Sequence, residues 1–113
     1  MESKWQLTYH WAASSYSLTD HIIQSYHFII GHDGEIHHGR FKPEANRPIP
    51  VPLRMRSNYA AHCGGENSWN IGISYLGMAG YSAKTVSPYP ITEAQAEVGF
   101  RLGAQLSMQY GIP

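Results

Sequence analysis

The chain has 113 residues, enough for one hydrophobic core but with little to spare for a second. Lysine plus arginine and aspartate plus glutamate number 8 each, so no strong field would draw the protein onto nucleic acid or an anionic membrane, and we expect neither as a partner. No apolar run has the length of a signal sequence or a membrane span, so we expect one domain over residues 1–113, made as a soluble cytoplasmic protein.

The first part of the chain is predicted to form a strand, a short helix and two strands of a hairpin, at residues 5–10, 18–24, 26–30 and 35–39. The first strand alternates apolar and polar side chains, which puts His10 at its end. Asp33 and Gly34 separate the last two strands and are typical of a tight hairpin turn, because such a turn requires positive φ.

The middle of the chain alternates between irregular and ordered segments. Residues 42–57 contain several prolines, which exclude a central strand or a helix, and we interpret them as an extended surface segment. Order is expected to resume at residues 59–62. The single cysteine, Cys63, follows in a glycine-rich turn and is expected to be a free thiol. Residues 70–76 are rich in β-branched side chains and predict a buried strand.

The clearest element is an amphipathic helix over residues 92–110. Thr92 and Gln95 have the spacing of a capping box, and apolar side chains recur every four residues after them. Gly99 and Gly103 each cost about 1 kcal/mol relative to alanine inside a helix, so we expect the helix to approach a sheet closely there. The sequence therefore predicts an α/β fold, a mixed β-sheet with the long C-terminal helix on one face and a functional groove on the other.

Several short strings, in a fixed order along nearly the whole chain, carry a family resemblance. They are His10-Trp11-Ala12-Ala13-Ser14, Tyr26-His27-Phe28-Ile29-Ile30, Asp33-Gly34, Gly39-Arg40, Tyr59-Ala60-Ala61-His62, Asn67 with Ile71-Gly72-Ile73-Ser74, Pro90-Ile91-Thr92-Glu93-Ala94-Gln95 and Tyr110-Gly111-Ile112-Pro113. Together they resemble the N-acetylmuramoyl-L-alanine amidase family, which includes phage lysozymes and peptidoglycan recognition proteins. The resemblance implies an amidase/peptidoglycan-recognition-like fold, and zinc-dependent hydrolysis of the amide bond between MurNAc and L-Ala of peptidoglycan.

The resemblance also implies roles for individual residues. His10 resembles the first zinc ligand of the family, and Tyr26 resembles its active-site tyrosine, which orients the attacking water or stabilises the developing oxyanion. His62 and Asn67 stand where the family has a histidine and an asparagine near the substrate. Without the resemblance, His10 is an ordinary strand histidine, Tyr26 is a core residue, and His62 and Asn67 are turn residues.

Other histidines and tryptophans carry less specific signals. The remaining histidines of the strand and hairpin region are expected to be structural or exposed: His27, His32, His37 and His38. His37 and His38 are neighbours in a strand, so they point to opposite faces and cannot both join one site. Trp11 and Trp69 fit either a stacking surface for sugar or peptide, or plain packing.

In the family, the second and third zinc ligands follow the long helix, as does a catalytic lysine or glutamate in some members. We therefore expect a single amidase-like catalytic domain that lacks its C-terminal segment, with a cleaved C-terminal fragment or a second copy of the chain as partners besides peptidoglycan. Residues 1–113 alone should hold zinc weakly or not at all, and should then be inactive, because one imidazole supplies no chelate.

Two functions remain open from the sequence. The first is an endolysin-like bacteriophage enzyme that hydrolyses the MurNAc–L-Ala amide of the bacterial cell wall. The alternative is a non-catalytic peptidoglycan-binding or regulatory module of the same fold. A glycosidase would need paired carboxylates flanking a sugar bond, and no such pair is evident.

Overall fold

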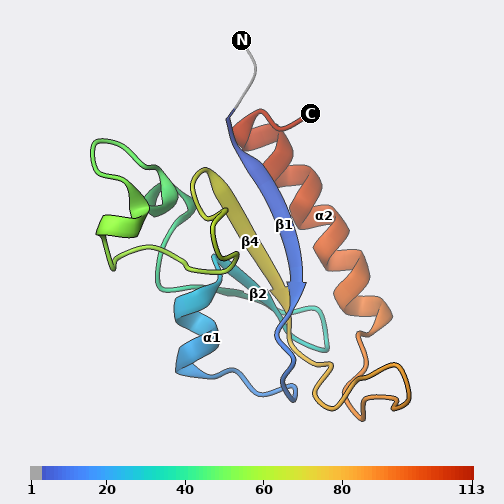
Figure 1. The fold of residues 1–113 in the computed structure, drawn as a ribbon. Coiled ribbons are helices and arrows are strands. Elements are labelled where there is room, and N and C mark those ends of the chain that lie inside the picture. The colour runs from blue at the N-terminus through green and yellow to red at the C-terminus, as the bar shows by residue number, and fades with distance from the viewer. Residues whose placement is uncertain (1–3) are drawn as a thin grey trace.

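A computed structural model describes residues 4–113, in which a four-stranded sheet lies between a long helix and a layer of loops and short helices (Figure 1). The strands are β1 (Gln6–Trp11), β2 (Phe28–Ile30), β3 (Ile36–His38) and β4 (Asn70–Tyr75), and the helices are α1 (Asp20–Ser25) and α2 (Glu93–Tyr110). The sheet order is β1-β4-β2-β3, with β1 and β2 parallel to β4, and β3 antiparallel to β2. The predicted mixed sheet and its hairpin are confirmed.

The two faces of the sheet carry different cores because side chains alternate along each strand. On one face, Ile71 and Ile73 of β4 pack with Leu102 and Leu106 of α2. On the other face, a smaller cluster joins Ile29 of β2 to α1 and to the chain after β4. Figure 1 shows the same division, with α2 on one side of the sheet and α1 on the other. The prediction that the long helix covers one face is confirmed.

Helix α2 begins at a complete capping box and approaches the sheet at its glycines. The Thr92 side chain accepts a bond from the Gln95 N–H, and the Gln95 side chain accepts one from the Thr92 N–H. A Cβ added to Gly99 would overlap the Tyr75 ring, and one added to Gly103 would overlap the Tyr9 hydroxyl. The close approach predicted from the two glycines is therefore present.

We expect Gly99→Ala to lower the free energy of unfolding by about 1–3 kcal/mol, although alanine is the better helix former. The added methyl group would displace the Tyr75 ring, which stacks on Tyr9 with a centroid separation of 6.1 Å. Urea denaturation measures the change. Ser107→Ala in the same helix is the matched control and should be neutral or slightly stabilising. A stability gain for Gly99→Ala would show that the helix is not held against the sheet there.

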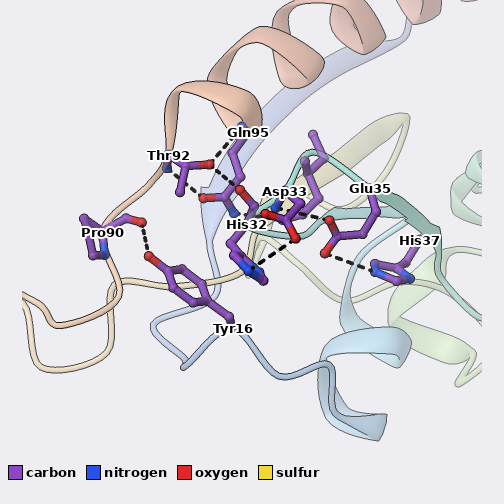
Figure 2. Close-up of polar contacts among 9 residues, drawn as sticks. Tyr16, His32, Asp33, Glu35, His37, Pro90, Thr92 and Gln95 are labelled. Atoms are coloured by element: carbon purple, nitrogen blue, oxygen red, sulfur yellow. Dashed lines mark hydrogen bonds and ion pairs between the residues drawn. The ribbon is translucent and has the colours of Figure 1, made fainter.

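The start of α2 is tied to the hairpin and to the loop after β1 (Figure 2). The buried Gln95 amide donates to the carbonyl oxygens of Ile30 and Leu76, at 2.9 and 2.8 Å. Figure 2 also shows Thr92 bonded to the hairpin, where its hydroxyl donates to the His32 carbonyl. The Tyr16 ring stacks on the His32 ring, and its hydroxyl donates to the Pro90 carbonyl at 2.6 Å. Four segments far apart in sequence, at residues 16, 30–32, 76 and 90–95, are fixed together at this end of the sheet.

The structure corrects two predictions for the middle of the chain. Residues 42–57 are not simply an extended surface segment, because they contain the 3-10 helices η1 (Pro43–Asn46) and η2 (Leu53–Met55), each with buried side chains. The family resemblance also implied a strand at residues 59–62, and these residues form none. The backbone of Ala60 is instead paired with the side chain of Asn46, which supplies the bonds a neighbouring strand would make.

Within residues 4–113, no helix combines the length and apolar character needed to cross a membrane.

Candidate active site

Three of the predicted site residues converge on the sheet face that lies away from α2. His10 is near the end of β1, Tyr26 caps the C-terminus of α1, and His62 lies in the loop before β4. The His10 Nε2 and His62 Nδ1 atoms are 3.0 Å apart. The ring centroids of His10 and Tyr26 are separated by 5.3 Å. Residues 16 and 52 positions apart in sequence thus form one cluster, although their chemical roles stay predictions.

Hydrogen bonding fixes the tautomer of His62. Its Nε2 atom lies 2.9 Å from the carbonyl oxygen of Asn70, which can only accept, so Nε2 carries the proton. His62 Nδ1 then carries the lone pair that accepts the hydrogen bond from the His10 Nε2–H. Burial lowers the pKa of both imidazoles, and in His62 the neighbouring His10 lowers it further against the opposing Asn70 bond. Both rings are therefore neutral at pH 7.

Asn67 lies close to His62 but acts on its backbone. The Asn67 Oδ1 atom accepts bonds from the N–H groups of His62 and Cys63, at 3.0 and 2.8 Å. These bonds are those of a turn residue that shapes the loop. Asn67 also lines a pocket with Tyr59 and Ser68, and its contact with substrate stays a prediction.

Behind this cluster lies a buried histidine that sequence reasoning treated only as structural or exposed. The His27 side chain is 2% exposed. Its Nδ1 accepts from the Gly72 N–H at 2.9 Å, so Nε2 carries the proton and donates to Asn46 Oδ1, also at 2.9 Å. Burial lowers the pKa of His27 to about 4, against the opposing effect of the Asn46 bond. His27 is a neutral structural group that supports the floor of the site.

Asn46 connects this floor to the loop that carries His62. Its Nδ2 donates to the carbonyl oxygens of Ala60 and Asn67, at 2.9 and 3.1 Å, and its Oδ1 accepts from the Ala60 N–H. The side chain is fully buried. No sequence signal marked it, because an asparagine in a proline-rich stretch resembles any other turn residue.

Two hydroxyl groups on this face have no protein partner within the described residues. The Tyr26 hydroxyl makes no hydrogen bond to residues 4–113. The Ser74 Oγ atom is likewise unpaired among them, although its side chain is 0% exposed. Ser74 is paired with His10 across β1 and β4, so the two side chains point to the same face. Both hydroxyls can hydrogen-bond to a bound molecule or to water.

The sequence model of the N-acetylmuramoyl-L-alanine amidase family (Amidase_2) matches residues 3–113. The chain belongs to this family. The solved structure of Drosophila peptidoglycan recognition protein (PGRP)-SA is similar in fold, with a TM-score of 0.58 and 16% sequence identity over 96% of this chain and 62% of that chain. The chain therefore spans less than two thirds of that relative. Comparison with curated protein sequences gives no match. The predicted family and fold are confirmed.

Membership of this family implies a zinc ion. The histidine, cysteine and acidic side chains present show whether the described residues could hold one. Catalytic zinc sites have three protein ligands and one open position. Within the part of the chain that the structure describes, no group of three or more histidine, cysteine or acidic side chains could hold a metal ion. The amidase-family chain presents two converging imidazoles, His10 and His62, and residues 4–113 do not fit a complete catalytic zinc site.

Several other candidates lie outside the His10 cluster. The Cys63 thiol is free, as predicted, and lies 4.0 Å from a Glu66 carboxylate oxygen. Trp69 packs edge-on against Trp5, at a centroid distance of 5.1 Å, which agrees with its packing interpretation. Trp11 is 52% exposed and contacts Tyr81 edge-on, so it remains available for stacking.

Stability of this amidase-family domain should fall in mild acid because of His27. Its folded pKa of about 4 lies below the usual 6.5, so the unfolded chain binds the proton first as pH falls. The stabilising effect is complete above pH 6.5 and is lost as pH falls from about 6.5 to 4, by about 3 kcal/mol in total. His10 and His62 shift in the same direction. Urea unfolding at intervals from pH 7 to pH 4 measures this, and a flat profile would contradict a buried neutral His27.

Proposed function

We propose that the protein binds peptidoglycan across the face that carries His10, Tyr26 and His62, and hydrolyses the amide bond between MurNAc and L-Ala. The observation that carries the proposal is the convergence of these three side chains from β1, the end of α1 and the loop before β4. Membership of the amidase family supports the reaction class. We further propose that the bacterial cell wall is the site of action, as for an endolysin.

The residues present suit amide hydrolysis in two respects. The neutral imidazoles of His10 and His62 can accept a proton from water or bind a cation, because burial keeps them unprotonated at neutral pH. The unpaired Tyr26 hydroxyl can donate to the carbonyl oxygen as negative charge develops on it. Zinc dependence, with His10 as a ligand, is part of the proposal.

Purified sacculi test the proposed reaction. Incubation with the protein should release stem peptides with new L-alanine amino termini and no new reducing sugar ends. His21→Ala, which removes an exposed histidine of α1, should leave this release unchanged, and His10→Ala should abolish it. New reducing ends without free L-alanine would assign the protein to another class of cell-wall hydrolase.

A non-catalytic peptidoglycan-binding module is the second candidate, and the fold shared with a peptidoglycan recognition protein supports it. Two imidazoles converge among the described residues where a catalytic zinc site has three protein ligands. Such a module would co-sediment with sacculi and release no L-alanine. Sedimentation and amino-terminus release, measured on the same sample, separate the two functions.

A further inference from the structure

We propose that the Ser74 hydroxyl donates a hydrogen bond to Nδ1 of His10 and so positions the imidazole of the candidate active site. Ser74 acts through His10 and touches no substrate, so it is a positioning residue. The bond is inferred from the arrangement of side chains on this face of the sheet. Only its effect on turnover rests on the proposed amidase function.

The Ser74 hydroxyl needs a partner within the fold, because the side chain is enclosed. It is 0% exposed, and its Oγ atom makes no hydrogen bond within residues 4–113. A buried hydroxyl without a partner destabilises the folded state, and most buried polar side chains in proteins are therefore hydrogen-bonded. The Oγ atom of a serine has staggered positions about the Cα–Cβ bond, so it can turn towards a neighbouring side chain without a shift of the backbone.

The neighbours of Ser74 on its own face of the sheet leave one candidate partner. Four residues surround it there: its register partners His10 and Ile29, and Gly72 and Leu76 two positions away along the chain. Of these, only His10 has a polar side chain. Adjacent strands lie about 4.7–4.9 Å apart, a separation that a serine hydroxyl and a histidine ring can bridge.

His10 offers the acceptor that Ser74 lacks. The Nε2 atom of His10 lies 3.0 Å from His62 Nδ1 and donates to it, because the proton of the His62 ring is on its own Nε2. Nδ1 of His10 therefore carries a lone pair, and no residue in the described part of the chain donates to it. A donor without an acceptor thus lies beside an acceptor without a donor.

Tyr26 has the other unpaired hydroxyl near His10, and exposure distinguishes it from Ser74. The ring centroids of Tyr26 and His10 are 5.3 Å apart, but the Tyr26 side chain is only half-buried. Water can therefore serve as the partner of the tyrosine hydroxyl. The fully buried serine has no such alternative, so the bond to His10 is assigned to Ser74.

The bond completes a chain of three hydrogen bonds that run in one direction. Ser74 donates to His10, His10 donates to His62, and His62 donates to the Asn70 carbonyl. Each bond in such a chain polarises the next and strengthens it. A hydroxyl can also accept, so the pairing with Ser74 persists when the proton moves to Nδ1 and leaves Nε2 of His10 free to act on a substrate. Ser74 thereby holds the ring of His10 in either tautomer.

Nitrogen-15 NMR of the histidine rings tests the bond on the unmodified chain at pH 7. His10 should show a protonated Nε2 and an unprotonated Nδ1, whose resonance has the lower chemical shift of a hydrogen-bonded acceptor. In Ser74→Ala this Nδ1 resonance should move towards the value of a free lone pair, and Ser74→Thr, which keeps a hydroxyl, should restore it. A His10 Nδ1 resonance at the free value in the unmodified chain would overturn the proposal, whether or not the variants fold.

Two further variants are controls for the NMR measurement. Ser87→Ala removes another buried serine hydroxyl, one that donates to the Ala79 carbonyl, and should leave the His10 resonances unchanged. Tyr26→Phe should leave His10 Nδ1 a hydrogen-bonded acceptor. Loss of the bonded shift in Tyr26→Phe, with no change in Ser74→Ala, would assign the bond to the tyrosine and overturn the proposal.

Urea denaturation gives an independent measure of the bond. If the Ser74 hydroxyl had no partner, its removal in Ser74→Ala would relieve an unpaired buried group and raise the urea midpoint. We expect a lower midpoint instead, because the substitution leaves His10 without its donor. A higher midpoint for Ser74→Ala than for the unmodified chain would contradict the bond.

Turnover separates this inference from the proposed function. Ser74→Ala should lower the turnover of L-alanine release about 10- to 100-fold with KM unchanged, the scale of a misplaced catalytic group. An unmodified chain that showed the bonded His10 resonance but released no L-alanine would retain the bond and remove the amidase function. Full turnover in Ser74→Ala, with an unchanged His10 resonance, would retain the function and remove the positioning role.

Discussion

Replacing Tyr26 with phenylalanine should lower the turnover of MurNAc–L-Ala hydrolysis about 100-fold or more, with little change in the free energy of unfolding. A positioned hydroxyl that acts as an acid or stabilises an oxyanion contributes about 10²–10³-fold to a rate. The Tyr26 ring packs against the smaller core of Ile22, Ile29 and Leu76, and phenylalanine preserves that packing. The hydroxyl makes no hydrogen bond within residues 4–113, so its removal leaves no protein group unpaired.

Steady-state release of L-alanine amino termini from sacculi measures the effect, and urea denaturation measures stability. Tyr81→Phe is the matched control, because that ring is 56% exposed and contacts Trp11 and not His10. The control should keep full turnover. If Tyr26→Phe lost stability and activity in proportion, the tyrosine would be a core residue and not a catalytic one.

Asn46→Ala should lower the free energy of unfolding by about 4 kcal/mol. The substitution leaves the His27 Nε2–H and the Ala60 N–H without their acceptor, in a fully buried place. The Ala60 carbonyl oxygen loses its donor as well, whereas the Asn67 carbonyl keeps the bond from the Asn70 N–H. Each unpaired buried polar group costs about 1–3 kcal/mol, partly offset where water enters.

Thermal and urea unfolding measure this loss. Asn58→Ala, at an exposed position of the same region, should change stability by no more than about 0.5 kcal/mol. Asn46→Asp is informative in addition, because it keeps an acceptor for His27 but removes the donor to Ala60 and faces two carbonyls with a carboxylate. A stability of Asn46→Ala equal to that of the control would show that the loop is held by other contacts.

Local sequence patterns predicted the elements whose signals lie within a single segment of the chain. The capping box and apolar repeat gave α2, and the β-branched run gave β4, because both signals lie within one segment. His10, Tyr26 and His62 were identified only through their family strings, since no spacing along the chain indicates that they meet. Their meeting follows from the parallel pairing of β1 and β2 on either side of β4.

The buried polar network could not be predicted, for a physical reason. The bonds from His27 to Asn46 and from Gly72 to His27 span 19 and 45 residues, and no period in the sequence reports a single long-range contact. The same network explains the strand wrongly expected at residues 59–62. The family string at residues 59–62 suggested a strand paired with another backbone, whereas the pairing group for Ala60 is a side-chain amide.

The bonds between His27 and Gly72 also decide how β2 aligns with β4. The His27 N–H donates to the Gly72 carbonyl at 3.0 Å, and the Gly72 N–H donates to the His27 ring. His27 therefore bonds to both the N–H and the C=O of Gly72. A slip by two residues would bring His27 against Asn70 or Ser74. A Cβ at position 72 would overlap the His62 ring, so the residue that bonds to His27 is also the one that leaves room for that ring. His27, the residue just before the three-residue strand β2, thereby favours one alignment of β2 with β4 and disfavours mispairing during folding.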